Sequence, residues 1–424
     1  MANSGPITLL TSGTRGDVQP YVALGLGLRE AGHRVRLVAP EAFRSFVAPS
    51  GLPFAGFAGN PSELLARPDA QAALNDSGNL IRTLQASLRY ARDARPVYRQ
   101  MLASAWEACQ GSRALVIGLP TVWGAHIAEA LGIPPAWAFL QPFARTRANP
   151  SALLPMRVRL GAGGNAFTHR IVEQVMWAPW RGIVNAWRTR ALGLPAAPLL
   201  YPYAELYGPN ALAVYGYSPA VSPRPADWPA GHQVLGYWFW DDDFGWHPPA
   251  GLESFLSEQP PALSLSFGTA ALRDPETMLP LVMRAVALSG TRAVVAAPQA
   301  WHAALACSPR VFPITGAPHA WLFARVAGAV HHGGAGTTGY SLRAGLPTLV
   351  IPHATDQFYW GDRIAALGAG PPLLARHTLT AEALAGALGE LAGDAAMRAK
   401  ARAIGQAIRA ENGVARAVEL LSRV

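Results

Sequence analysis

Residues 327–347 read AGAVHHGGAGTTGYSLRAGLP, and three different patterns follow one another within them. AGAV is typical of a short buried strand, and TTGYSLRA predicts a helix that Gly345 and Pro347 end. The residues between them, HHGGAG, are too small to build a core and are predicted to form a strand-to-helix turn. In parallel α/β sheets such turns lie at the carboxyl ends of the strands, where ligands bind.

This turn is predicted to bind an anion. Its glycines leave backbone N–H groups accessible at a helix N-terminus, which carries a partial positive charge. A phosphate or diphosphate is the natural occupant of such a position. Thr337 and Thr338 can add hydroxyl donors, and a histidine can donate to an anionic oxygen. A tight turn that holds no ligand is the alternative.

A second group of polar side chains follows the next buried strand, TLVIP, at residues 348–352. The sequence HATDQF comes directly after it and contains Asp356 and Gln357. A carboxylate and an amide side by side offer acceptors and donors that match the vicinal hydroxyls of a sugar. A diphosphate beside a hydroxyl-rich group indicates a nucleotide sugar. An Asp that only caps the following helix is the alternative for Asp356.

The overall pattern predicts an α/β protein with two Rossmann-like domains, whose parallel sheets face each other across a cleft. Near the N-terminus, the strand ITLL, the loop TSGTRGD, a helix and the strand RVRLVAP form one βαβ unit. A similar unit recurs from ALSLSFGTA onward, and GHRVRLVAP (32–40) aligns with GTRAVVAAP (290–298). A chain of 424 residues suits two such domains. The loops 11–17, 266–270, 331–338 and 353–357 are then expected to line the cleft.

Composition restricts the class of protein further. Half of the residues are hydrophobic and 14% are charged, which is typical of a packed globular protein. The two cysteines form no metal or disulfide pattern, and no signal peptide or membrane span is recognisable, so we expect a cytoplasmic protein. The net charge of +9 comes from arginines that are spread along the chain, and this argues against nucleic acid. A basic amphipathic segment, 79–95, predicts either an ordinary solvated face or peripheral contact with the inner membrane surface. We expect a monomer or a weak dimer.

The segment 318–371, PHAWLFARVAGAVHHGGAGTTGYSLRAGLPTLVIPHATDQFYWGDRIAALGAGP, resembles the donor-binding signature of family 1 glycosyltransferases of GT-B fold. TSGTRGDVQPYVALGLGLREAGHRVRLVAP, YGYSPAVSPRPADWP and GYWFWD are similar to the sterol 3β-glucosyltransferase-like branch. The resemblance implies an N-terminal acceptor-binding domain at 1–220 and a linker at 221–250. It further implies a C-terminal nucleotide-sugar domain at 251–405 and a last helix, 406–424, that crosses back to the N-terminal domain.

The resemblance also assigns the donor-binding residues. It implies that His332 contacts the donor diphosphate and that Asp356 and Gln357 hold the sugar hydroxyls. It places Ala317 to His319 along a uracil and the turn from Ser266 to Gly268 near the phosphates. The residues expected to form the phosphate cradle are Gly334, Ala335, Gly336 and Thr337. No metal and no further cofactor is needed to balance the charge of the donor diphosphate. The DDD of residues 241–243 is interpreted as a solvated turn.

Asp17, in SGTRGDVQP, is the candidate general base. An acceptor hydroxyl must lose its proton as it attacks the anomeric carbon, which inverts the configuration from α to β. Many plant members of the family use a His in this loop, backed by an Asp, but this chain has no His there and has Gly118 where the Asp would lie. Antibiotic-modifying and sterol-type relatives carry an Asp at the position of Asp17. A plain helix N-cap is the alternative role.

The acceptor is expected to bind in the N-terminal domain. The region 143–190 is rich in Arg and Trp, and aromatic rings suit a flat apolar aglycone such as a sterol, triterpenoid, flavonoid or polyketide. Gln141, Trp177 and Trp180 are the candidates, with core packing as the alternative for each Trp. The sequence thus predicts an inverting transfer of a hexose, glucose first, from a UDP-sugar. A nucleotide-sugar-binding protein without transferase activity and a nicotinamide-dependent oxidoreductase are the alternatives, although GTRG is not G-x-G-x-x-G.

Overall fold

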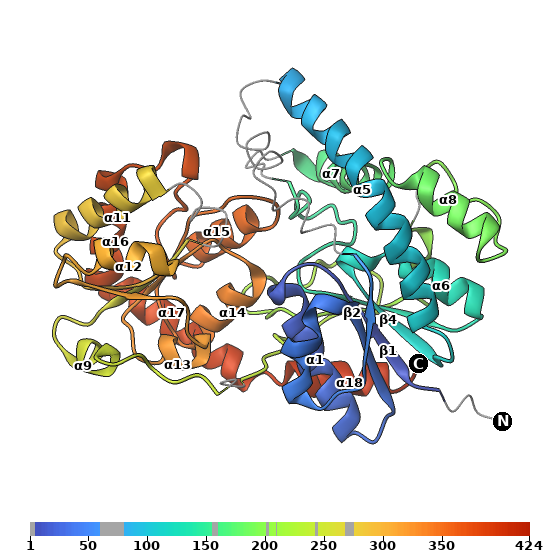
Figure 1. Ribbon diagram of the computed structural model, residues 1–424, viewed down its shortest axis with the longest axis horizontal. Coiled ribbons are helices and arrows are strands. Elements are labelled where there is room, and N and C mark those ends of the chain that lie inside the picture. Colours follow the sequence, from blue (N-terminus) through green and yellow to red (C-terminus); the bar gives the residue numbers. More distant parts are fainter. Residues whose placement is uncertain are drawn as a thin grey trace.

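A computed structural model of the chain describes residues 5–59, 80–154, 160–200, 203–208, 210–241, 245–267 and 275–424. It shows two α/β domains side by side (Figure 1). Each has one parallel sheet at its centre with helices on both faces, so the predicted fold class is confirmed. Among the described residues, no helix combines the length and the apolar character that crossing a membrane requires.

The N-terminal sheet has seven parallel strands in the order β3-β2-β1-β4-β5-β6-β7. Short runs of Val, Leu, Ile and Ala form its central strands, and these are buried on both faces, as a parallel sheet requires. The strands are β1 Ile7–Leu10, β2 Val35–Pro40, β3 Phe54–Phe57, β4 Ala114–Gly118, β5 Pro135–Phe139, β6 Leu212–Tyr215 and β7 His232–Val234.

Among the described residues, six α-helices and four short 3₁₀ turns complete this domain. The α-helices are α1 Arg15–Glu30, α2 Arg44–Val47, α5 Leu80–Ala108, α6 Gly124–Leu131, α7 Gly161–Trp177 and α8 Arg181–Arg190. The 3₁₀ turns are Glu41–Phe43, Ala48–Ser50, Leu119–Thr121 and Ala204–Tyr207. The predicted basic amphipathic segment 79–95 falls on the start of α5, where the side chains before residue 92 lie outside the described part.

The C-terminal sheet has five parallel strands in the order β10-β9-β8-β11-β12. These strands are β8 Leu263–Ser266, β9 Ala293–Ala296, β10 Val311–Ile314, β11 Ala329–His331 and β12 Thr348–Val350. In the part of this half that the structure describes, the α-helices are α9 Leu252–Ser257, α11 Pro275–Ser289, α12 Gln299–Leu305, α13 His319–Phe323, α14 Ala335–Arg343, α15 Gln357–Ala366, α16 Ala381–Gly393, α17 Ala395–Ala410 and α18 Gly413–Leu421. A 3₁₀ turn, Arg376–Thr378, precedes α16.

Each sheet has a point at which the direction of strand addition reverses, and the two points position the site. In the N-terminal sheet the reversal lies between β1 and β4, and in the C-terminal sheet it lies between β8 and β11. Loops on the two sides of such a point diverge and leave a crevice beyond the carboxyl ends of the strands. Helix α1, whose first turn contains Asp17, follows β1, and the loop that carries His332 follows β11.

The connection between the domains differs in detail from a plain linker. The strand β7 lies within the range 221–250 and extends the N-terminal sheet at its edge. Beyond it, Trp238 and Trp240 pack into the N-terminal core. Asp241 makes a two-pronged ion pair with Arg343 of α14, at 2.7 and 2.6 Å. Asp241 is itself exposed, as the interpretation of a solvated segment expects, and the other two Asp residues of DDD lie outside the described residues.

The last helix returns to the N-terminal domain. Helix α18 packs on α1, where a Cβ at Gly27 would come within 2.5 Å of Val414 Cγ1. Arg416 also donates to the backbone oxygen of Leu235 at 3.2 Å. The chain therefore passes between the two domains twice, and Figure 1 shows α18 beneath α1.

Candidate active site

The turn after β11 leaves a helix N-terminus open. Gly334 is the N-cap of α14 and makes no side-chain cap, so the amides of the first helical turn, Ala335 to Thr337, have no intrahelical partner. Gly333 has φ of +89°, and a Cβ there would lie 2.5 Å from Val350. A Cβ on Gly336, in contrast, would meet no atom within 4 Å. The space beside Gly336 is therefore free to receive an anion.

The two histidines of this turn have different environments. His331 is buried, and its Nδ1 accepts from the Gly333 amide at 3.0 Å, which places the proton on Nε2 beside the Ser341 hydroxyl at 3.2 Å. Both ring nitrogens of His331 thus hold the turn itself. His332 is partly exposed, and its Nδ1 is buried with no hydrogen-bond partner among the described residues. Burial, with a contribution from His353, lowers the pKa of His332 to about 4.

The loop between β12 and α15 is held by its own side chains. Gln357 Oε1 accepts from the amides of His353 and Ala354, at 2.7 and 3.1 Å. Asp356 accepts from the Thr355 hydroxyl at 3.0 Å and from the Trp360 indole N–H at 2.9 Å. Thr355 has φ of +50°, a conformation that a β-branched residue adopts only when its surroundings enforce it. The side-chain NH₂ of Gln357 is then the part of this pair best placed to meet a ligand.

Asp17 is the third residue of α1 and is not the N-cap of this helix. The N-cap is Thr14, and Asp17 closes a capping box with it. The backbone amide and the hydroxyl of Thr14 both donate to Asp17 Oδ2, at 2.7 and 2.9 Å. Burial raises the pKa of Asp17 to about 6, against the lowering effect of these hydrogen bonds. The negative charge of Asp356 raises it further, so these two carboxyl groups from different domains sense each other.

The other donor residues assigned from the sequence lie around the same loops. Ser266 ends β8 and pairs with His331 across the sheet. His319 is the first residue of α13 and stacks on Tyr340, with ring centroids 5.5 Å apart. Burial, helped by the charges of Arg15 and His332, lowers the pKa of His319 to about 4. Ala317 lies just before α13 and is partly exposed, whereas Gly268 lies outside the described residues.

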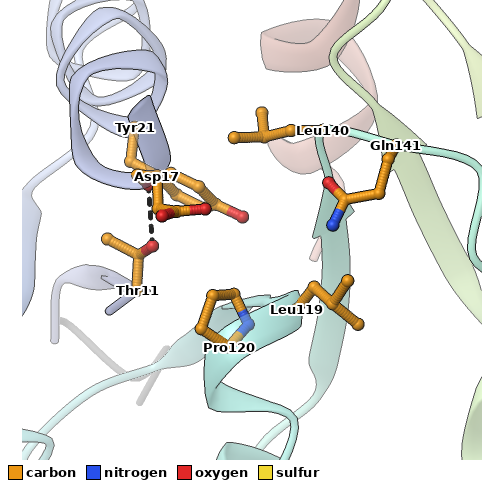
Figure 2. Close-up of a pocket in the computed structure, with 7 residues that line it drawn as sticks. All are labelled: Thr11, Asp17, Tyr21, Leu119, Pro120, Leu140 and Gln141. Carbon is orange, nitrogen blue, oxygen red and sulfur yellow. Dashed lines mark hydrogen bonds between the residues drawn. The ribbon is translucent and has the colours of Figure 1, made fainter. Parts of the chain in front are cut away.

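A small pocket lies beyond the carboxyl ends of β1, β4 and β5. Its lining residues are Thr11, Asp17, Tyr21, Leu119, Pro120, Leu140 and Gln141, and it holds about 170 Å³ of empty space, part of it open to solvent. Figure 2 shows the carboxylate of Asp17 and the amide of Gln141 on opposite sides of the pocket, with Leu119 and Pro120 along its lower edge in this view. A candidate base and a candidate acceptor contact thus share one mostly apolar pocket.

Trp177 and Trp180 do not line this pocket. Trp177 is 3% exposed, belongs to the N-terminal core and donates its indole N–H to the Pro198 oxygen at 3.2 Å. Trp180 stacks face to face on Tyr98 of α5, with centroids 4.2 Å apart. Both rings are engaged in packing between helices, which is the alternative that the sequence left open for them.

Three further residues were not assigned from the sequence. Gln19 of α1 donates to the Trp240 oxygen at 3.0 Å and to the Tyr340 hydroxyl at 3.3 Å, so it joins the two domains beside the site. His353 places Nε2 2.8 Å from the Phe267 oxygen and ties the loop after β12 to the end of β8. Its position at the carboxyl end of a strand was the available signal. For Gln19 and Tyr340 no local signal existed, because their partners lie in the other domain.

Family models match the two halves of the chain separately. Residues 7–150 match the N-terminal domain of glycosyltransferase family 28. Residues 283–420 match the C-terminal domain described as erythromycin biosynthesis protein CIII-like. The two-domain arrangement is the GT-B fold, and over these two ranges the chain is similar to domains of glycosyltransferases.

Curated relatives make the assignment more specific. The chain is 35% identical to a sterol 3-beta-glucosyltransferase of Cryptococcus neoformans var. neoformans over 98% of its own length and 27% of the relative's length. It is 36% identical to one of Aspergillus clavatus over 100% of its own length and 30% of the relative's. The chain thus spans less than a third of the length of these relatives.

Solved structures agree on the fold. The glycosyltransferase of kitacinnamycin superposes with a TM-score of 0.69 at 19% identity and covers 100% of this chain and 99% of its own. Glycosyltransferase VinC, in complex with dTDP, superposes with a TM-score of 0.68 at 20% identity. The superposition covers 99% of this chain and 98% of VinC. These likenesses establish the GT-B arrangement of the two domains.

Proposed function

We propose that the protein transfers a hexose, glucose first, from a UDP-sugar to a hydroxyl of an apolar acceptor, with inversion and with Asp17 as the general base. One observation carries the proposal: helix α1, which contains Asp17, contacts helix α14 through Gln19 and Tyr340, and the charge of Asp356 contributes to the raised pKa of Asp17. The candidate base and the candidate sugar-binding loop therefore face the same space.

The donor half of the reaction needs a cradle for a diphosphate leaving group. The free amides of the first turn of α14 and the open space at Gly336 supply it. As the bond between the anomeric carbon and the phosphate oxygen breaks, negative charge grows on the diphosphate. Donors that are already aimed at this charge stabilise the transition state without reorganising. His332 adds a side chain whose Nδ1 has no partner among the described residues.

The acceptor half needs a base that is deprotonated but still basic. With a pKa of about 6, Asp17 is ionised at neutral pH and binds a proton more readily than an ordinary carboxylate. As the acceptor oxygen forms its bond to the anomeric carbon, its proton passes to Asp17. Attack from the face opposite the leaving diphosphate converts an α-linked sugar into a β-glycoside.

The substrates are proposed from the relatives and from the pocket. Relatives named as sterol 3-beta-glucosyltransferases support glucose as the sugar and a sterol as the first acceptor to test. The apolar side chains of Leu119, Pro120 and Leu140 in the pocket with Asp17 suit such a molecule. Two structural neighbours, SsfS6 and VinC, are complexes with thymidine diphosphate and dTDP, so a thymidine donor is the main competitor for UDP.

The test is a matrix of donors and acceptors with the purified chain. UDP-glucose, UDP-galactose and dTDP-glucose are each incubated with a sterol, a flavonoid and a macrolide polyketide, with and without a metal chelator. We expect a hexoside of the sterol from UDP-glucose, a β-linkage by the proton coupling at the anomeric carbon, and no effect of the chelator, because helix and histidine donors balance the diphosphate charge. Donor binding without any product would instead assign the chain to the nucleotide-sugar-binding proteins.

A further inference from the structure

Helix α7 exposes a row of large apolar side chains although it also buries four polar ones, which departs from the pattern of an ordinary surface helix. Phe167, Ile171 and Val175 are 61%, 40% and 66% exposed and fall four residues apart, so they share one face. Leu160, just before the helix, continues this row, and Leu199 and Leu200 lie beside it because Gln174 donates to the Leu199 oxygen at 3.2 Å. We call these six residues the α7 stripe.

The contacts of the buried face of α7 explain why its polar side chains are buried. Its polar residues fix the segment after β5: Asn165 donates to the Arg147 oxygen at 3.0 Å, and Thr168 accepts from the Ser151 amide at 2.9 Å. Glu173 forms a buried ion pair with Arg145. These polar side chains thus contact the domain, although Asn165 Oδ1 has no hydrogen-bond partner among the described residues. Nothing in those contacts requires large apolar groups on the opposite face.

The exposed apolar residues are concentrated at this one place. Among the described residues, all large hydrophobic side chains that are more than about a third exposed belong to the α7 stripe, apart from Leu288 of α11. Scattered exposed leucines are normal, but a continuous apolar patch marks an interaction surface.

The charges around the stripe select the partner. Between residues 160 and 200 the exposed charged residues are Arg170, Arg181 and Arg190, and the single acid, Glu173, is buried against Arg145. Helix α5, which packs on α8 beside them (Figure 1), adds exposed Arg95 and Arg99, and its exposed Asp93 is paired with Arg92. Apolar side chains bordered by arginines are the composition with which helices lie in the interface of an anionic bilayer.

A second copy of the chain fits less well. In a symmetric dimer the same patch would face itself, so the arginines that border the stripe would be brought opposite one another. The stripe is also separate from the pocket at Asp17, since none of its six residues lines that pocket.

We propose that the α7 stripe docks the protein on an anionic lipid bilayer. Phe167, Ile171 and Val175 enter the boundary between head groups and acyl chains, and Arg170 and Arg181 contact the phosphates. If the acceptor is a sterol within a membrane, which rests on the proposed function, this docking presents the N-terminal domain to the layer that contains it. Docking itself needs neither donor nor acceptor, so its test is independent of catalysis.

The experiment is flotation of the full chain with vesicles of phosphatidylcholine alone or mixed with phosphatidylglycerol, without substrates. We expect binding to the mixed vesicles that weakens with salt. The double variant F167S/V175S should bind at least about tenfold more weakly, which corresponds to about 1.4 kcal/mol. The matched control is Leu288→Ser, which removes an equally exposed hydrophobic side chain from the other domain and should bind like the wild type.

Three outcomes would overturn the proposal. They are wild-type protein that does not float with anionic vesicles, equal flotation of F167S/V175S and wild type, and a wild-type dimer in light scattering that the double variant converts to a monomer. If F167S/V175S fails to fold, R170Q/R181Q tests the charged border of the stripe with the packing intact, and undiminished flotation of that variant contradicts docking. Failure of the transferase assay would leave these results unchanged.

Discussion

Thr14 holds the carboxylate of Asp17 by two hydrogen bonds to the same oxygen, Oδ2, one from its backbone amide at 2.7 Å and one from its hydroxyl at 2.9 Å. This pair is the capping box of α1, and it separates the structural role of Asp17 from the proposed catalytic role. An amide oxygen can accept both bonds, but an amide cannot remove a proton from an alcohol.

Asp17→Asn should therefore keep the fold and lose turnover. We expect kcat to fall by about 10²–10⁴-fold, the usual contribution of a general base. The midpoint of thermal unfolding and the affinity for UDP should change little. The matched control is Thr14→Ala, which removes one bond of the capping box, costs about 1 kcal/mol of stability and leaves the base in place. A kcat for Asp17→Asn near that of the wild type would show that Asp17 only caps the helix.

The activity should rise with pH through about 6. Burial and the nearby charge of Asp356 raise the pKa of Asp17, so its protonated, inactive form persists to about that pH. The raised pKa affects the free energy of unfolding in the opposite direction to the activity. The contribution of Asp17 to stability is present at low pH, because the folded state holds its proton more tightly than the unfolded state, and it is lost as the pH rises through about 6. In Asp356→Asn, the rising limb of kcat/KM should move to lower pH because a repelling charge is gone. A limb that does not move would show that the two carboxyl groups are uncoupled during catalysis.

The fold could be predicted from local patterns because its central strands and glycine turns are continuous in the sequence. The edge strand β7 could not, since three residues in a Pro-rich stretch carry no recognisable period. Asp17 and His332 could be proposed as site residues because each lies in a motif, and their roles stay predictions. The roles of Trp177 and Thr14 required the structure: composition cannot distinguish a ring that lines a pocket from one in the core, and the bond that fixes Asp17 depends on how α1 begins.

His332, and not His331, should contribute to donor affinity. His332→Ala is expected to weaken UDP binding by about 1–3 kcal/mol, the range for a hydrogen bond to a charged group. His331→Ala should chiefly lower the stability, because it removes the partners of Gly333 and Ser341 inside the fold. Calorimetry and thermal unfolding on both variants separate the two effects.

UDP binding should also take up a proton near pH 5. The pKa of His332 is about 4 in the unliganded protein, and the negative charge of a diphosphate raises it, so His332→Ala should abolish this uptake.

Gly336→Ala should stabilise the protein and still disable it. Because a Cβ at this position meets no atom within 4 Å, alanine fits the unliganded fold, and in a helix it is favoured over glycine by about 1 kcal/mol. The same methyl group would occupy the space proposed for the diphosphate, so UDP affinity should fall by at least about tenfold. Gly386→Ala in α16 is the matched control, since its Cβ also meets no atom and it lies in a helix outside the site. Equal UDP affinity of Gly336→Ala and wild type would place the phosphates elsewhere.

The last prediction concerns Gln357, whose two side-chain atoms have different tasks. Its Oε1 accepts from the amides of His353 and Ala354, so Gln357→Ala would disturb the loop as well as any contact with the sugar. Gln357→Glu keeps an acceptor for both amides and removes only the NH₂ donors. If these donors bind a sugar hydroxyl, Gln357→Glu should weaken the binding of UDP-glucose by about 1–3 kcal/mol while leaving inhibition by UDP nearly unchanged. It should also reduce the preference for glucose over galactose, because specificity is a difference between two binding energies. A variant whose affinities for UDP and UDP-glucose fall equally would show that Gln357 supports the loop and does not bind the sugar.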